Sequence, residues 1–120
     1  MQMFIAELRQ RYGADAVSTR MMGTETLVKV AGVPVPHRSN VMTDVLIVLA
    51  SNFRTNGGRP PVYVKPGTTQ PNGRPGRNVN PALVHGESWL GMSWQFDWSA
   101  GLPAWTLVEG AVRRFSINDD

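Results

Sequence analysis

Few residues in this chain could do chemistry, and their spacing matches no catalytic or metal-binding pattern. The sequence contains no cysteine, which excludes a thiolate nucleophile, a thiolate metal site and a disulfide. The two histidines, His37 and His85, each lie in an expected loop without a second metal ligand at a recognisable spacing. Ser88 follows His85 and Glu87 closely, but a catalytic triad is recognised by its geometry and not by adjacency. We therefore expect neither a metal nor a cofactor.

Positive charge gathers in the middle of the chain. No acidic residue occurs between Asp44 and Glu87, whereas that stretch contains five cations, Arg54, Arg59, Lys65, Arg74 and Arg77. A loop region of one sign attracts a carboxylate, an acidic segment or a phosphate. Solvated arginines that keep a loop soluble explain the same pattern equally well, so both interpretations stay open. The formal net charge of +3 is only weak support for a nucleic-acid partner, which we do not expect.

Aromatic residues form a second candidate surface in the segment 89–98, which contains Trp89, Trp94, Phe96 and Trp98. Such residues can stack on bases in proteins that bind single strands. A cluster of this kind is more often core beneath a long loop, and we favour that interpretation for most of it. The candidate binding residues are the members of this cluster that stay exposed and the neighbouring loop, namely Tyr63, Arg74, Arg77, Trp94 and Trp98.

The elements that must position these residues follow from hydrophobic periodicity. An apolar stripe on a 3.6-residue period predicts a helix over 2–12, with Gly13 after its end. A second stripe predicts a helix over about 103–115. Short β-prone runs lie between them, and the run 45–50 is apolar on both faces, which indicates a central strand. Residues 66–88 have no strand or helix period, and their prolines and glycines predict a long loop.

These elements predict an α+β fold of one domain, residues 1–120. It comprises an N-terminal helix, an antiparallel meander sheet of three to four strands, a long Pro/Gly loop and a C-terminal helix. No apolar run approaches the roughly 20 residues of a membrane span, and the first residues mix charges with apolar positions, unlike a signal peptide. We expect a cytoplasmic protein without a membrane partner.

The order of these elements resembles the ubiquitin-conjugating (UBC) fold. The resemblance rests on Pro-Pro-Val-Tyr-Val-Lys-Pro at 60–66, the glycine-punctuated loop, Gly-Glu-Ser-Trp-Leu at 86–90, and Trp98. It covers roughly residues 1–115 and is strongest for the catalytically inactive UEV group and for bacterial proteins of the same fold. It implies a helix leading into a four-stranded meander, and an active-site loop before the next helix.

The resemblance also implies where a degenerate active site would lie. The family's His-Pro-Asn stretch falls on 78–80, where only Asn80 matches, and the glycine before the active site falls on Gly86. The catalytic cysteine falls on Trp89, with Ser88 and His85 close by. Without a cysteine at that position no thioester can form.

We therefore expect a non-catalytic, UEV-like binding module. Its implied partner is a ubiquitin-like protein or an activating-enzyme-like protein of a bacterial conjugation-like system. Two alternatives stay open. One is a conjugating, transferase-type enzyme whose cysteine is replaced at residue 88 or 89 of this sequence. The other is a structural or assembly component of a larger particle.

Overall fold

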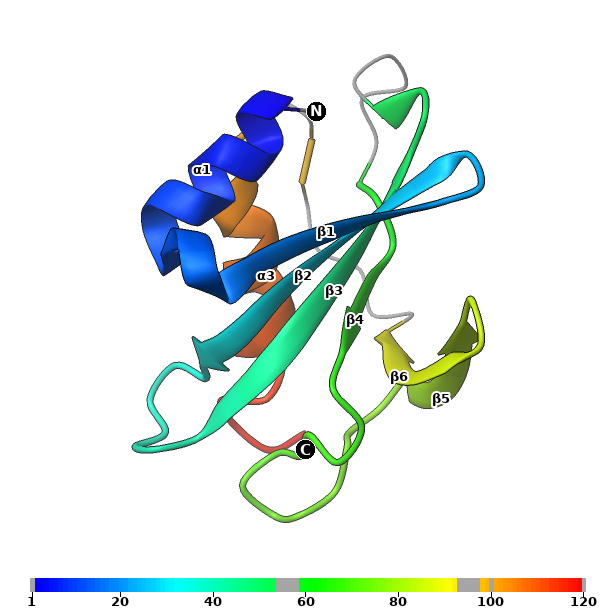
Figure 1. The fold of residues 1–120 in the computed structure, drawn as a ribbon. Helices are drawn as coiled ribbons and strands as arrows, with labels where there is room; N and C mark the ends of the chain where they lie inside the picture. The colour runs from blue at the N-terminus through cyan, green and yellow to red at the C-terminus, as the bar shows by residue number, and fades with distance from the viewer. Residues whose placement is uncertain (1, 54–58, 93–97, 100, 120) are drawn as a thin grey trace.

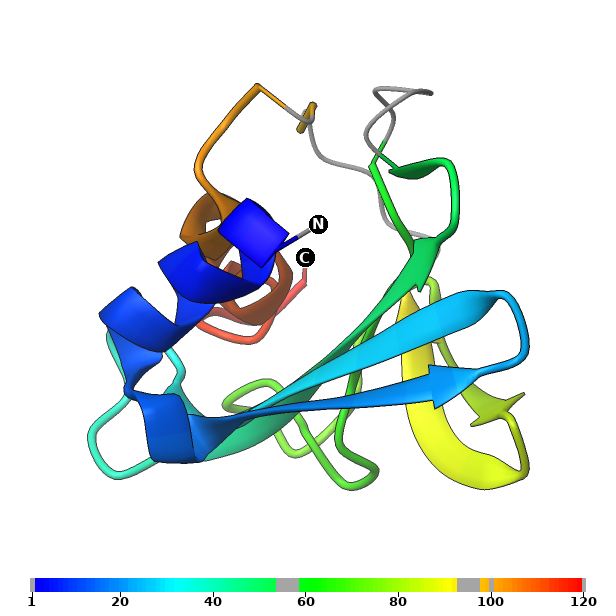
Figure 2. The ribbon, with the colours of Figure 1, turned by 45° about the horizontal axis from the view of Figure 1, so that its top comes forward.

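The fold is a twisted antiparallel sheet with two helices on one of its faces (Figures 1 and 2). A computed structural model describes residues 2–53, 59–92, 98–99 and 101–119. Its elements in chain order are α1 (Gln2–Tyr12), a 3₁₀ turn (Ala14–Ala16), β1 (Val17–Met22), β2 (Glu25–Pro34), β3 (Met42–Ala50), β4 (Val62–Val64), β5 (Val79–Val84), β6 (Glu87–Met92) and α3 (Ala104–Arg113). The α+β class and both terminal helices are as the sequence predicts.

The sheet begins as a meander and ends with a hairpin added beside β4. Its strand order is β1-β2-β3-β4-β6-β5, and every neighbouring pair is antiparallel. β3 lies between β2 and β4, and its side chains at 45–49 are buried on both faces of the sheet. This confirms the prediction of a central strand from an apolar run without alternation.

The main core fills the space between the sheet and the two helices. Phe4 and Leu8 of α1 are fully buried there, as are Leu107 and Val108 of α3. α1 ends at Tyr12 and is followed by Gly13, whose φ is +95° and whose N–H donates to the Arg9 carbonyl at 2.8 Å. A glycine takes this left-handed conformation without the steric cost of a Cβ, so the predicted helix end is confirmed.

The hairpin β5–β6 lies within the predicted loop 66–88 and beyond it, and is a correction to the predicted sheet. His85 and Gly86 have φ values of +48° and +83° and connect Val84 to its partner Glu87, as in a two-residue type I′ turn. Pro81 interrupts the strand pattern of β5, but it is tolerated because β5 is an edge strand. The expected three to four strands are therefore six, and the predicted loop 66–88 ends at residue 78.

The hairpin folds over the sheet face that the helices leave open. Val84 and Trp89 pack there against a second buried cluster formed by Leu27, Leu46 and Val48. Two polar contacts also join it to β2: the His85 Nε2 atom lies 2.8 Å from Glu25 Oε1, and the Lys29 ammonium lies 5.9 Å from the centre of the Trp89 ring. The hairpin thus shields apolar residues of the central strands from water.

Candidate binding groove

The four positions of the implied degenerate active site all lie on the β5–β6 hairpin. Asn80 and Ser88 are exposed on β5 and β6, and His85 is in the turn between them. Trp89 is only 4% exposed and its indole N–H donates to Glu87 Oε1 at 2.7 Å. Ser88 and Trp89 point to opposite faces of β6, and Asn80 pairs with Gly91, far along the hairpin from His85. The hairpin does not bring the four together.

The candidate binding residues have different positions in the fold. Tyr63 is half-buried on β4, opposite Gly91. Trp98 is buried in the main core, where it stacks on Phe53 and its indole N–H donates to Thr106 Oγ1 at 2.9 Å. It therefore supports the core interpretation and is not part of an exposed surface. Trp94 lies outside the described residues, as do Phe96 and Arg54. Arg74 and Arg77 are exposed on the loop that follows β4.

Arg77 belongs to a groove of about 550 Å³ at the C-terminal end of α3. Three segments far apart in sequence form it: the β2–β3 connection at His37, the loop at Arg77 and Asn78, and residues 113–119. Its cationic side chains are Arg77, Arg113 and Arg114, and Asp119 is the one carboxylate among the described residues that line it. We call it the basic groove. A neighbouring hollow of about 480 Å³ shares Arg77 and Asp119 and adds Arg74.

Arg114 is the centre of the groove's hydrogen bonds. Its guanidinium forms a two-pronged pair with Asp119, with Nη1 at 2.7 Å from Oδ1 and Nη2 donating to Oδ2 at 2.8 Å. Nη2 also donates to the Arg77 carbonyl at 2.7 Å. The side chain is only 7% exposed, and a charge this far from water requires such partners.

Asp119 receives a third hydrogen bond from the loop. The Arg77 N–H donates to Oδ2 at 2.6 Å, and the N–H of Asp119 itself donates to Gln70 Oε1 at 3.2 Å. The Arg114 guanidinium first, and the Arg77 amide second, hold the pKa of the Asp119 carboxyl well below its usual range. The groove therefore already holds one carboxylate in a set of donors suited to that group.

The loop that carries these donors is ordered by its own hydrogen bonds. The N–H of Gln70 donates to the Arg74 carbonyl at 2.8 Å, and the N–H of Gly73 donates back to the Gln70 carbonyl at 2.9 Å. Arg38 joins the loop to the end of α3, since its Nη1 donates to the carbonyls of Thr69 at 2.6 Å and Phe115 at 3.2 Å. The part of the predicted long loop between β4 and β5 is thus a structured segment.

Only part of this groove can be predicted from the sequence. The stretch without acidic residues predicts Arg74 and Arg77 as candidates, whereas Gln70, Arg114 and Asp119 are not among the predicted site residues. The structure brings these residues together at Gly76, since a Cβ there would lie 2.6 Å from Gln70 Nε2 and 2.9 Å from Arg114 Nη2. A glycine next to a proline predicts a turn, so the sequence alone does not reveal this close approach.

The chemistry that this arrangement offers is anion recognition. Within the described ranges, no group of three or more His, Asp or Glu side chains could hold a metal ion. None of the described helices is long and apolar enough to span a membrane. Comparisons of the chain with protein-family models, with curated proteins and with solved structures found no match.

Proposed function

We propose that this chain is a non-catalytic binding module of the UBC-like kind, and that its basic groove takes an acidic segment of a partner. The resemblance suggests a ubiquitin-like protein, or another member of a bacterial conjugation-like system, as that partner. The observation that carries the proposal is that Arg77, Arg113 and Arg114 all line one groove, with the Arg114 guanidinium and the Arg77 N–H bound to the same carboxylate. The three arginines come from a loop and a helix end separated by more than thirty residues of sequence.

The groove favours carboxylates for two reasons. Arg114 presents both Nη atoms in the fork that matches the two oxygens of a carboxylate. Arg77 is exposed on the loop beside it, and Arg74 lies in the neighbouring hollow. Exposed charges of one sign raise the rate of encounter with a partner of the opposite sign and disfavour partners of the same sign.

Two features support binding in place of group transfer. The position implied for the catalytic residue is Trp89, which is buried and hydrogen-bonded in the second core. Ser88 is exposed beside it, but the nearest histidine in sequence, His85, has its ring directed to Glu25. A serine nucleophile needs a base within hydrogen-bonding reach, and among the described residues Ser88 has no hydrogen bond to such a base.

The element order agrees with the UBC-like part of the proposal. α1 precedes the β1–β4 meander, and a loop and hairpin separate that meander from α3. In chain order the hairpin β5–β6 falls where the resemblance implies an active-site loop. The proposed class of partner is supported by the resemblance, and the proposed binding site is supported by the arginines that line the groove.

The test is charge reversal at the edge of the groove. The variant Arg74→Glu/Arg77→Glu changes two exposed side chains, and Arg9→Glu/Arg20→Glu makes the same change in net charge on α1 and β1. Tagged wild type and both variants are incubated with lysate of the source cells at low and moderate salt, and bound proteins are identified by mass spectrometry. Thermal unfolding verifies that each variant is folded.

We expect the wild type and the Arg9/Arg20 variant to capture a ubiquitin-like or activating-enzyme-like protein, with at least about tenfold less recovered by the Arg74/Arg77 variant. Equal recovery by all three would remove the basic groove as the binding surface. Capture of particle subunits, or of nucleic acid that is lost with salt, would remove the proposed partner class.

A further inference from the structure

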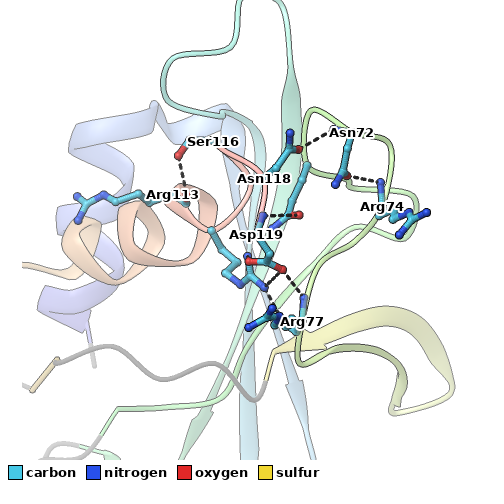
Figure 3. Close-up of polar contacts among 9 residues, drawn as sticks. Asn72, Arg74, Arg77, Arg113, Ser116, Asn118 and Asp119 are labelled. Atoms are coloured by element: carbon cyan, nitrogen blue, oxygen red, sulfur yellow. Dashed lines mark hydrogen bonds and ion pairs between the residues drawn. The ribbon is translucent and has the colours of Figure 1, made fainter.

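The segment 116–119 lies across the loop (Figure 3). It places the Asp119 carboxylate against the donor set of the basic groove, which consists of the Arg114 guanidinium and the Arg77 N–H. Its contacts with the loop are polar. The Asn72 N–H donates to Asn118 Oδ1 at 2.8 Å, and Asp119 makes the bonds described above. The side chain of Ile117 is 69% exposed and adds little apolar burial. A segment held in this way can exchange its hydrogen bonds for those of a competing ligand.

The donor set is held in place by contacts that do not involve Asp119. The Arg114 Nη2 atom donates a hydrogen bond to the Arg77 carbonyl. Arg38 Nη1 donates both to the Thr69 carbonyl of the loop and to the Phe115 carbonyl. Gly76 allows Gln70 and Arg114 to approach the loop backbone closely. The site therefore keeps its shape when the segment leaves it.

We propose that Asp119 is an internal substitute for a carboxylate of the partner, so that the segment 116–119 acts as a latch on the basic groove. The partner's acidic segment binds by displacing Asp119 from Arg114 and from the Arg77 N–H. This inference rests on the proposed function, because it specifies how the same groove takes its ligand.

Because the Arg114 guanidinium is buried, release of the Asp119 carboxylate must be accompanied by binding of another anion. Leaving Arg114 buried without an anion is costly, so the open state is stabilised by any carboxylate that can reach the fork. Two further buried donors, Gln70 Nε2 and Arg114 Nε, have no acceptor among the described residues. The site thus has more donors than Asp119 satisfies, which favours an exchange for a ligand with additional acceptors.

The experiment compares Asp119→Ala with Asp15→Ala, which removes the same charge from an exposed position on the 3₁₀ turn. The probe is a peptide of three Gly-Glu repeats, blocked at both ends, and its control is the same peptide with glutamine in place of glutamate. Affinities are measured by isothermal titration calorimetry at low salt. The apparent affinity of a closed site is reduced by the fraction of molecules that are open.

We expect Asp119→Ala to bind the glutamate peptide at least about tenfold more tightly than the wild type or Asp15→Ala, which corresponds to a latch closed in about nine of ten molecules. The glutamine peptide should bind none of the three. Asp119→Asn provides a second test if the alanine variant does not fold, because asparagine keeps the shape and loses the charge. The expected gain in affinity for Asp119→Asn is smaller, since the asparagine amide oxygen can still accept a hydrogen bond from the Arg77 N–H.

The failures of the two proposals can be told apart. Equal glutamate-peptide affinity in all variants would overturn the latch and leave the acidic-segment groove standing. Weaker binding by the Asp119 variants would also overturn the latch, because Asp119 would then organise the site. No binding of the peptide by any variant would overturn the proposed acidic-segment function, and the latch with it.

Discussion

Replacing Gly76 by alanine should destabilise the chain much more than the same change at Gly73. Both glycines lie in the loop and have positive φ, +100° and +83°. An L side chain in this region of backbone space costs about 1–2 kcal/mol. At Gly73 the new Cβ meets nothing within 4 Å, so the backbone cost stands alone. Alanine also restricts the unfolded chain, which offsets about 0.4–1 kcal/mol of that cost at both positions.

At Gly76 the new Cβ would collide with two side chains. It would lie 2.6 Å from Gln70 Nε2 and 2.9 Å from Arg114 Nη2. The ends of long side chains usually move aside, but these two are buried and hydrogen-bonded to Asp119. Overpacking of this kind costs roughly 1–3 kcal/mol. The backbone and unfolded-state contributions are similar in both variants, so the difference between them should be about 1–3 kcal/mol.

Urea unfolding of the two variants measures that difference, and amide hydrogen exchange shows where it acts. The N–H of Asp119 donates to Gln70, so its protection should fall in Gly76→Ala and stay unchanged in Gly73→Ala. If the free energies of unfolding of the two variants agree within about 0.5 kcal/mol, the close packing of Gln70 and Arg114 at Gly76 is refuted.

Two further predictions concern the hairpin and the acidic range of pH. Trp89→Ala should lower the free energy of unfolding by about 3 kcal/mol or more. Trp89→Phe should lower it by only about 1 kcal/mol and should leave binding of the glutamate peptide unchanged. Loss of peptide binding by a folded Trp89→Phe variant would contradict a purely structural role of this residue. The pKa of Asp119 is lowered in the folded state. As the pH falls through the ordinary aspartate pKa of about 3.9, the Asp119 carboxyl therefore takes up a proton in the unfolded state but not in the folded state. Stability from this carboxylate is therefore present above pH 4 and lost as the pH falls further, so Asp119→Asn should show a shallower loss of stability in acid. Parallel curves of unfolding free energy against pH for wild type and Asp119→Asn would disprove that contribution.

The sequence predicts best what is encoded locally. The stripe that includes Phe4 and Leu8 places α1 within its observed bounds, and the unbroken apolar run of β3 indicates a strand covered on both faces. Val62 and Val64 point to the main core and Tyr63 to the other face, as alternation requires. Each of these properties depends on a few neighbouring residues.

The missed features depend on partners distant in sequence or on exceptions to local rules. Pro81 argues against a strand at 79–84, since proline is tolerated only in edge strands and the sequence alone does not reveal which strands are edges. Arg114 and Gln70 are separated by more than forty residues and become one site only through the fold. Arg74 and Arg77 were identified because their shared feature, a stretch without acids, can be seen without the structure.

The pairing of the first helix with the last has a consequence for how the chain is made. The hydroxyl of Tyr12 on α1 donates to Glu109 Oε1 on α3 at 3.4 Å, across 97 residues of sequence. At a synthesis rate of about 5–20 residues per second, α3 follows α1 by roughly 5–20 s. Local hairpins close in about 1–10 μs, so the strands can pair long before the helical layer is complete. During that interval the valine-rich inner face of the sheet is uncovered, and a newly made chain is then most open to chaperones and to aggregation.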